Sequence, residues 1–209
     1  MNRVLINNLK TVVILAILTA GVWPSATRAS MVFSESFESP TAGPSGYSVG
    51  TGNLLVYGNP NYASPATAGT QFLVANPGNG PSGGSISWTF AVGVGTYTLT
   101  FDHLVYGFST ANQTLDVEVT SSSPGDLLNQ TMIDNRIGIP SPILTFTQTF
   151  TTTGVGSVTL TLTDNTPSAA GNSSDLIVDN IQVNGPPAPE PTSIAILVSA
   201  SGFLLRRRR

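Results

Sequence analysis

The chain has 209 residues, with 21 glycines, 15 prolines, one histidine and no cysteine, and its formal net charge at pH 7 is −3. The lack of cysteine excludes a disulfide framework and any thiol or zinc–thiolate chemistry. Between residues 30 and 189, ten carboxylates face a single cation, Arg136, so this part carries a formal charge of −9. Such an acidic body repels phosphate backbones and anionic lipids, which argues against nucleic acid and membrane surfaces as partners, and it attracts divalent cations.

Residues 1–29 read as a secretory signal peptide. Arg3 and Lys10 precede an apolar run at residues 11–22, and small polar residues then lead to Ala29, after which we expect cleavage. The alternative is an uncleaved membrane anchor, but the run is shorter than the about 20 residues that a membrane-spanning helix prefers. We therefore expect the protein to be exported.

The body, residues 30–184, is predicted to be one all-β domain. Residues of β type alternate with clusters of Gly, Pro, Asn and Ser, and no helical period is present. At residues 97–101 and 158–162, large apolar residues take one face and threonines the other, which is typical of an antiparallel β-sandwich with one solvated face per sheet. Eight to ten strands are expected, and the clearest cover residues 32–38, 70–75, 85–91, 96–104, 114–120, 144–152, 157–163 and 176–183.

The last expected strand carries a carboxylate among apolar residues. Ile177, Asp179, Ile181 and Val183 share one face, and if that face is the core, Asp179 points inward. An ionised carboxylate that is buried needs a metal, an arginine or several N–H groups. A metal is attractive because the body has one arginine, and the alternative is that Asp179 caps the backbone amides of a neighbouring loop.

The only histidine, His103, follows Asp102, which invites a catalytic interpretation. No Gly-x-Ser-x-Gly elbow or other nucleophile motif accompanies the pair, so we expect a histidine at the surface or at a strand end. A glycosidase pair of carboxylates would need a separation that a sequence does not give. The sequence is therefore taken as that of a non-enzymatic protein.

Aromatic side chains are the candidates for glycan contact, because sugar-binding modules stack such rings on pyranoses. Trp88 alternates with Ile86 and Phe90 on one strand face, which favours core packing. The better candidates are expected in loops rich in Gly, Asn and Pro, although covering the ends of the sandwich is an alternative role. These candidates are Tyr57, Tyr62, Tyr106 and Phe108.

The C-terminus has three parts that follow a stiff, Pro-rich spacer at residues 185–188. They are the triplet Pro189, Glu190 and Pro191, an apolar stretch at residues 192–205, and the terminal Arg206, Arg207, Arg208 and Arg209. As a helix, the apolar stretch would span only about 21 Å of the roughly 30 Å hydrocarbon core of a membrane. The arginines favour retention of this end on the cytoplasmic side, which leaves the body outside the membrane.

In this order, residues 189–209 resemble the PEP-CTERM sorting signal. The resemblance implies transient membrane insertion and cleavage near the triplet by an exosortase, a membrane-embedded cysteine transpeptidase. It also implies a bacterium that makes extracellular polysaccharide and delivers such proteins to its surface or matrix. An ordinary tail anchor is the alternative, and it explains the arginines but not the triplet.

The body resembles the galactose-binding-like jelly roll of many carbohydrate-binding modules. The likeness lies in residues 36–40 (SFESP), 95–101 (GTYTLTF) and 175–183 (DLIVDNIQV). It implies a structural Ca²⁺ held by Glu38 and Asp179, whose oxygen ligands suit that ion.

Two functions are compatible with these features of the sequence. The first is a structural or adhesive protein displayed at the cell surface or in the extracellular matrix. The alternative is a carbohydrate-binding module for exopolysaccharide. A hydrolase would require turnover of polysaccharide that depends on carboxylates.

Overall fold

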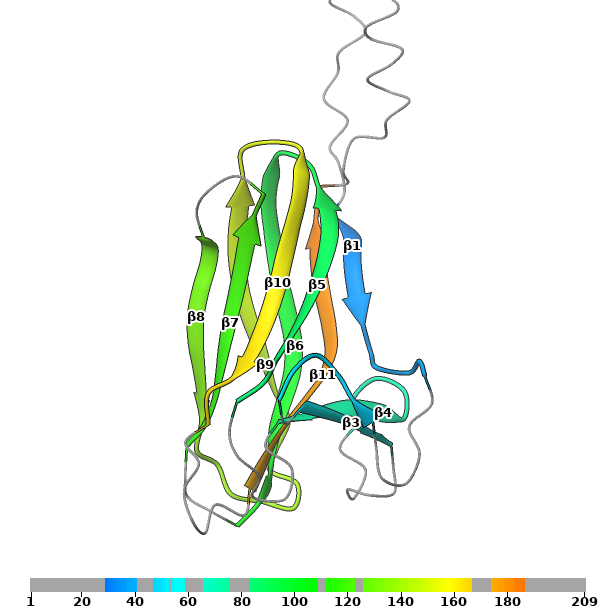
Figure 1. Cartoon of the computed structure of the whole chain (residues 1–209), viewed down its shortest axis with the longest axis vertical. Helices are drawn as coiled ribbons and strands as arrows, with labels where there is room; N and C mark the ends of the chain where they lie inside the picture. The colour runs from blue at the N-terminus through cyan, green and yellow to red at the C-terminus, as the bar shows by residue number, and fades with distance from the viewer. Residues whose placement is uncertain are drawn as a thin grey trace, which may run out of the picture.

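The computed structural model describes residues 29–40, 47–52, 54–58, 66–75, 83–108, 112–122, 126–166 and 174–186. This part of the chain is built from β-strands (Figure 1). In chain order they are β1 (Ser30–Glu35), β2 (Tyr47–Ser48), β3 (Leu54–Gly58), β4 (Gln71–Ala75), β5 (Ser85–Val92), β6 (Gly95–Gly107), β7 (Gln113–Ser121), β8 (Asp126–Asp134), β9 (Leu144–Thr152), β10 (Gly156–Asp164) and β11 (Ser174–Gly185).

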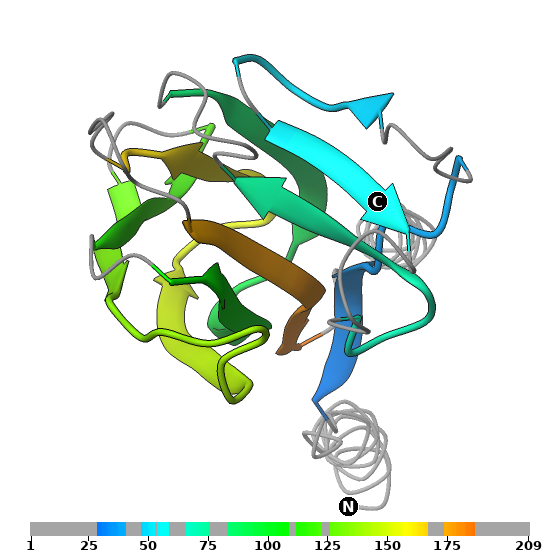
Figure 2. The same cartoon turned by 90° about the horizontal axis from the view of Figure 1, so that it is seen from below.

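The strands form two sheets that pack face to face (Figures 1 and 2). Sheet A has the order β2-β3-β4-β11-β6-β9, and β1 pairs with β11 beyond the end of β4. Sheet B has the order β5-β10-β7-β8. Neighbouring strands are antiparallel in both sheets. The prediction of an all-β antiparallel sandwich is confirmed.

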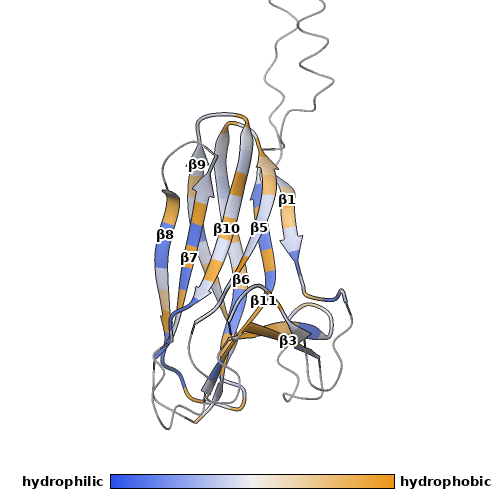
Figure 3. Cartoon of the chain, viewed as in Figure 1, coloured by the Kyte–Doolittle hydropathy of each residue, from blue (hydrophilic) through white to orange (hydrophobic). Residues whose placement is uncertain are grey.

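The main core lies between the two sheets and follows from the alternation in the sequence. In β7, Leu115, Val117 and Val119 are buried, while Asp116 and Glu118 between them are partly exposed. Apolar and polar residues alternate in the same way along other strands of both sheets (Figure 3). Because successive side chains of a strand point to opposite faces, each such strand supplies one apolar face to the core.

Strand β4 departs from this pattern, because all five of its residues are buried. Leu73 and Ala75 belong to the main core, whereas Phe72 and Val74 lie on the opposite face. There they form a second apolar cluster with Leu104 of β6 and Ile177 of β11. The expectation of one solvated face per sheet is therefore wrong for this part of sheet A.

Strand β11 changes its inward-facing set of residues midway. Leu176 and Val178 lie in the main core before an irregularity at residues 179–182, and Ile181 and Val183 lie there after it. Asn180 adopts a φ of 52° at this bulge, a left-handed conformation that asparagine tolerates better than most residues. The expectation that Ile177, Asp179, Ile181 and Val183 share one core face is therefore wrong, because the bulge shifts the alternation.

The two predicted addressing segments lie outside the described residues, except for Ala29, which is exposed. Among the residues that are described, no helix is long and apolar enough to cross a membrane. The predicted spacer starts inside the fold, because Gly185 ends β11 and the carbonyl of Pro186 accepts a 3.0 Å hydrogen bond from the hydroxyl of Tyr97.

Candidate functional site

The carboxylates of Glu38 and Asp179 hold the two ends of one loop, residues 67–71. Asp179 Oδ2 accepts hydrogen bonds from the N–H groups of Thr67 and Ala68, at 2.7 and 2.8 Å. Glu38 Oε1 accepts from the N–H groups of Thr70 and Gln71, at 2.8 and 2.7 Å. The loop that leads into β4 is thereby tied to the segment after β1 and to the bulge of β11.

The position of these groups follows from the pairing of β11. Its residues 176–178 pair with β4 and its residues 181–185 pair with β1. Asp179 therefore lies between the part of β11 that pairs with β4 and the part that pairs with β1. The residue after β1 that bends the chain, Phe37, is buried and has a φ of 60°. The side-chain amide of Gln71 donates to the carbonyls of Phe37 and Pro40 and closes the junction.

Asp179 is only 1% exposed, and burial raises the pKa of its carboxyl above the usual range, although N–H donors from Ala68, Thr67 and Asn180 oppose this shift. The capping role that the sequence left as an alternative is therefore present in the structure. Glu38 takes the same role on the other side of the loop. Sequence reasoning did not name this loop as the partner, because 112 residues separate Thr67 from Asp179.

The arrangement leaves one oxygen of each carboxylate with a single donor among the described residues. Asp179 Oδ1 accepts from the N–H of Asn180, at 2.7 Å, and Glu38 Oε2 accepts from the hydroxyl of Thr70, at 3.1 Å. A carboxylate oxygen has two lone pairs, so each of these atoms keeps one acceptor position. Within the same part of the chain no three acidic or histidine side chains gather as metal ligands, so a Ca²⁺ ion here would need main-chain or water oxygens as well.

Two tyrosines lie on the outer face of sheet A, away from the main core. Tyr57 belongs to β3 and Tyr106 to β6, and both pack, partly buried, against the second apolar cluster. The strands β4 and β11 separate them in the sheet. The expectation that both tyrosines lie in loops is wrong, because each is part of a strand.

The other two candidate aromatic residues differ from these tyrosines. Phe108 follows β6 directly and is 71% exposed, as the sequence predicted. Tyr62 lies outside the described residues. Trp88 packs against the main core, with its ring 5.9 Å from that of Phe33 and 6.2 Å from that of Phe37, so the preference for core packing is confirmed.

A polar network lies on the same face of sheet A as the two tyrosines. Asp102 is on the face of β6 that also carries Leu104 and Tyr106. Its carboxylate accepts hydrogen bonds from the side chains of Thr145 and Asn180, at 2.8 and 3.1 Å, and Gln182 donates to Asn180 at 2.7 Å. This network was not predicted from the sequence. The only indication of it in the sequence is Asp102, a polar residue two positions before Leu104.

His103 lies on the opposite face of β6 and joins the two sheets. It is 7% exposed, and its Nδ1 lies 3.0 Å from Oδ2 of Asp134 at the end of β8. Arg136 donates from Nε to Asp134 Oδ1 at 2.8 Å, and its guanidinium also contacts Oδ2 and the carbonyl of Pro142. The expectation of a histidine at the surface or at a strand end is wrong, because its partner faces it from inside the sandwich.

The charges of this group are matched to one another. Burial alone would raise the pKa of Asp134, but the hydrogen bonds from Arg136 and His103 outweigh burial and hold that pKa well below its usual range. Arg136 is the only cation between residues 30 and 189, and it binds Asp134. Asp179 lies on the other side of sheet A and is not paired with this arginine. The buried position of His103 makes it unsuited to reach a substrate.

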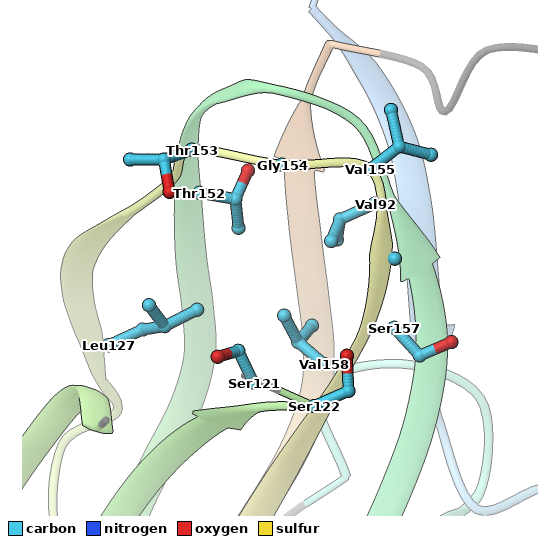
Figure 4. A pocket seen from close by; sticks show the side chains of 11 residues that line it. Val92, Ser121, Ser122, Leu127, Thr152, Thr153, Gly154, Val155, Ser157 and Val158 are labelled. Atoms are coloured by element: carbon cyan, nitrogen blue, oxygen red, sulfur yellow. The ribbon is translucent and has the colours of Figure 1, made fainter. Parts of the chain in front are cut away.

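A pocket of about 80 Å³ lies at the end of the sandwich formed by the β9–β10 turn (Figure 4). Val92, Leu127 and Val158 line it together with serine and threonine side chains, and it holds no charged or aromatic residue. Small-molecule sites usually enclose about 300–1,000 Å³. This pocket is therefore too small to be the main ligand site, and it lacks the charged or aromatic groups that would orient a ligand.

No family model matches the sequence, and no curated protein matches it. Among solved structures, 119 chains match. One is a cyclase from Fischerella sp. TAU, which is 17% identical with a TM-score of 0.51 over 78% of this chain and 100% of that chain.

Two of the other matches are carbohydrate-binding modules. The CBM22-1 xylan-binding domain of Xyn10C from Paenibacillus barcinonensis is 16% identical, with a TM-score of 0.43 over 76% of this chain and 96% of that one. A family 16 carbohydrate-binding module is 14% identical, with a TM-score of 0.41 over 58% of this chain and 82% of that one. At such identities the likeness concerns the fold alone.

Proposed function

We propose that the domain is an exported carbohydrate-binding module that contacts glycan through the outer face of sheet A. The observation that carries this proposal is the placement of Tyr106 on the same face of β6 as Asp102, four residues along the strand from the Asp102–Asn180 network. Sugar recognition combines an apolar ring face with hydroxyl groups that need donors and acceptors, and this face offers both.

The ligand would contact the tyrosines rather than the apolar cluster beneath them. Phe72, Val74, Leu104 and Ile177 are at most 1% exposed, so they support Tyr57 and Tyr106 without reaching solvent. A ring that is fixed by packing loses little conformational freedom when it binds, which favours affinity. Phe108, which follows directly after β6, extends the exposed aromatic surface.

Electrophoresis of the exported protein through gels that contain soluble polysaccharides tests this function. Retardation in a subset of the glycans, relative to a gel without glycan, supports binding. Equal mobility in all gels contradicts it.

We also propose that the tail, residues 189–209, directs the protein to the cell surface or extracellular matrix through an exosortase. This route rests on the resemblance of the PEP triplet, apolar stretch and arginine cluster to the sorting signal. It is compatible with a binding domain, because a module displayed in the matrix is placed beside exopolysaccharide.

A structural or adhesive role in the matrix is the second candidate. It is favoured by the hydroxyl-rich outer faces, where Thr89 bonds Thr159 at 3.0 Å in sheet B and Thr96 bonds Thr151 at 3.1 Å in sheet A. Such cross-strand pairs stabilise a sheet without requiring a ligand. Failure of the protein to bind any glycan would favour this second role.

We further propose that Glu38 and Asp179 hold a structural Ca²⁺ through the two oxygens with an open acceptor position. The ion would supply charge compensation for the buried carboxylate of Asp179 and fasten the loop 67–71. We assign no catalytic role, since His103 is buried and its partner Asp134 is already bound to Arg136.

A further inference from the structure

Strand β9 forms one edge of sheet A. It pairs with β6 along Leu144–Thr152, and in the described part of the chain no strand pairs with its other side. In Figure 1 it lies with β8 at the side of the sandwich away from β1. A strand of nine residues therefore presents backbone N–H and C=O groups that can pair with another strand.

This edge lacks the usual protection against pairing. The sequence LTFTQTFTT has no charged residue, no proline and no glycine, whereas natural edge strands are commonly guarded by lysine, proline or bulges. The remaining edges differ. Strand β2 has two residues, β1 has a bulge and ends at Glu35, and β8 begins and ends with aspartates. Strand β5 is also uncharged, but its sequence SISWTFAV is not symmetric about its centre, so two copies of it would not place like residues opposite one another.

The charge of the molecule restricts the partner. The body carries a formal charge of −9, so two copies repel each other across most of their surface. Along β9 the outward side chains are Thr145, Thr147, Thr149 and Thr151, which are exposed and uncharged. A second copy can approach this edge without placing carboxylates opposite one another.

The sequence of β9 is also nearly palindromic about Gln148. Thr147 and Thr149, Phe146 and Phe150, and Thr145 and Thr151 lie at equal distances on either side of it. Antiparallel pairing of β9 with β9 of a second copy therefore places threonine opposite threonine on the outer face and phenylalanine opposite phenylalanine on the inner face. Such pairs are favourable across neighbouring strands.

We propose that the protein forms a two-fold symmetric dimer in which the β9 strands of two copies pair antiparallel about Gln148, joining their A sheets into one. The contact is self-complementary, as a two-fold interface requires. Because the two-fold axis stands perpendicular to the sheet, the outer faces of both copies point the same way. In terms of the proposed function, two glycan-binding faces would then act on one polymer and gain avidity.

Charge placement on the outer face tests the register. In the dimer, residue 147 of one copy faces residue 149 of the other. The variant Thr147→Lys/Thr149→Lys sets lysine against lysine, whereas Thr147→Lys/Thr149→Glu sets lysine against glutamate. Both variants alter exposed positions, so circular dichroism should show the wild-type fold for each of them.

The measurement is the mass in solution of the exported protein by light scattering over a concentration series, compared with the mass of the same preparation when unfolded. We expect a wild-type mass near twice the unfolded-chain value, a monomer for the Lys/Lys variant, and a dimer for the Lys/Glu variant. A wild-type monomer at every concentration would overturn the proposal, as would a Lys/Lys variant that dimerises as well as the wild type.

A cysteine cross-link gives an independent readout that does not depend on glycan binding. Gln148→Cys places two thiols at the two-fold axis, and the chain has no other cysteine. Opposite residues of antiparallel strands have Cα atoms about 4.5–5.5 Å apart, within disulfide range. Thr98→Cys, on the neighbouring β6, is the matched control. We expect a covalent dimer for Gln148→Cys alone, and equal cross-linking of the two variants would contradict the register.

Discussion

Nδ1 of His103 lies 3.0 Å from Oδ2 of Asp134, and this contact joins sheet A to sheet B inside the sandwich. The single histidine of the chain and the single arginine of its body, Arg136, both bind this one carboxylate. A buried ion pair of this kind holds its geometry because each member would be costly to leave unpaired. The group is thus a structural fastener, and it does not lie on the proposed glycan face.

Replacing Asp134 with alanine should destabilise the fold by roughly 3–5 kcal/mol, because Arg136 and the buried His103 lose their partner. Urea unfolding followed by circular dichroism measures this change. Glu118→Gln, on the outer face of sheet B, is the control and should change the free energy of unfolding by less than about 1 kcal/mol. Equal effects of the two substitutions would contradict the fastening role.

The same carboxylate predicts a dependence on pH. The pKa of Asp134 is lowered in the folded state from its usual value of 3.8, so its contribution to stability is present above that value and is lost as the pH falls toward the folded pKa. The difference in unfolding free energy between wild-type protein and Asp134→Ala should therefore shrink below pH 3.8. A constant difference across this range would show that the ion pair is not its source.

Removing the carboxylate of Asp179 should loosen the loop 67–71. In Asp179→Ala the N–H groups of Thr67 and Ala68 lose their acceptor, at about 1–3 kcal/mol for each buried donor left unpaired. Hydrogen exchange should speed up at these two amides while the amides of β7 stay protected.

The carboxyl of Asp179 also predicts a dependence of stability on pH. Since burial raises the folded pKa of Asp179, its contribution to stability is greatest below pH 3.8 and falls as the pH rises through the folded pKa.

Calcium should stabilise the wild-type protein through the same junction. After treatment with EDTA, added CaCl₂ is expected to raise the thermal midpoint by several degrees, since a ligand at about 100 times its Kd contributes about 2.7 kcal/mol. Glu38→Gln should abolish this rise, and MgCl₂ should have little effect because Mg²⁺ prefers a stricter octahedral geometry. A thermal midpoint that does not change when calcium is added would exclude a bound metal ion. Glu38 and Asp179 would then act only as caps of the backbone amides of the loop 67–71.

The tail is tested by the intact mass of protein recovered outside the cells. We expect a species that starts near Ser30 and ends near the triplet formed by Pro189, Glu190 and Pro191. Deletion of residues 189–209 should prevent normal surface delivery. Recovery of a chain that still carries Arg206 to Arg209 would identify the tail as a membrane anchor and contradict processing by an exosortase.

The sequence was sufficient for those strands in which residue type alternates without interruption. Strand β9 was predicted with its observed limits, Leu144–Thr152, and β7 and β10 to within one residue at each end. Strand β3 was missed because its five residues are apolar on both faces, and β8 was missed because its sequence DLLNQTMID does not alternate regularly. For Tyr57, the Gly, Asn and Pro residues that follow it in the sequence favour a loop, whereas it lies in β3.

The partners of the candidate site residues were beyond sequence reasoning for a different reason. Asp179 could be recognised as a carboxylate in an apolar strand, but its acceptor role depends on a loop 112 residues away. The bulge at Asn180 shifts the alternation of β11, so that Leu176 and Val178 face the main core instead of Ile177, and no local sequence pattern indicates this bulge. Contacts between distant segments and a one-residue change of register are set by the whole fold.

Isothermal titration of the exported protein with a polysaccharide that retards it in gels tests the central claim most directly. The comparison uses Tyr106→Ala, Tyr57→Ala and, as a control, Val155→Ala at the exposed β9–β10 turn. We predict that each tyrosine variant remains folded and binds about tenfold more weakly, which corresponds to about 1.4 kcal/mol, while the control binds like the wild type. Wild-type affinity in both folded tyrosine variants would contradict the assignment of the outer face of sheet A as the glycan-binding surface.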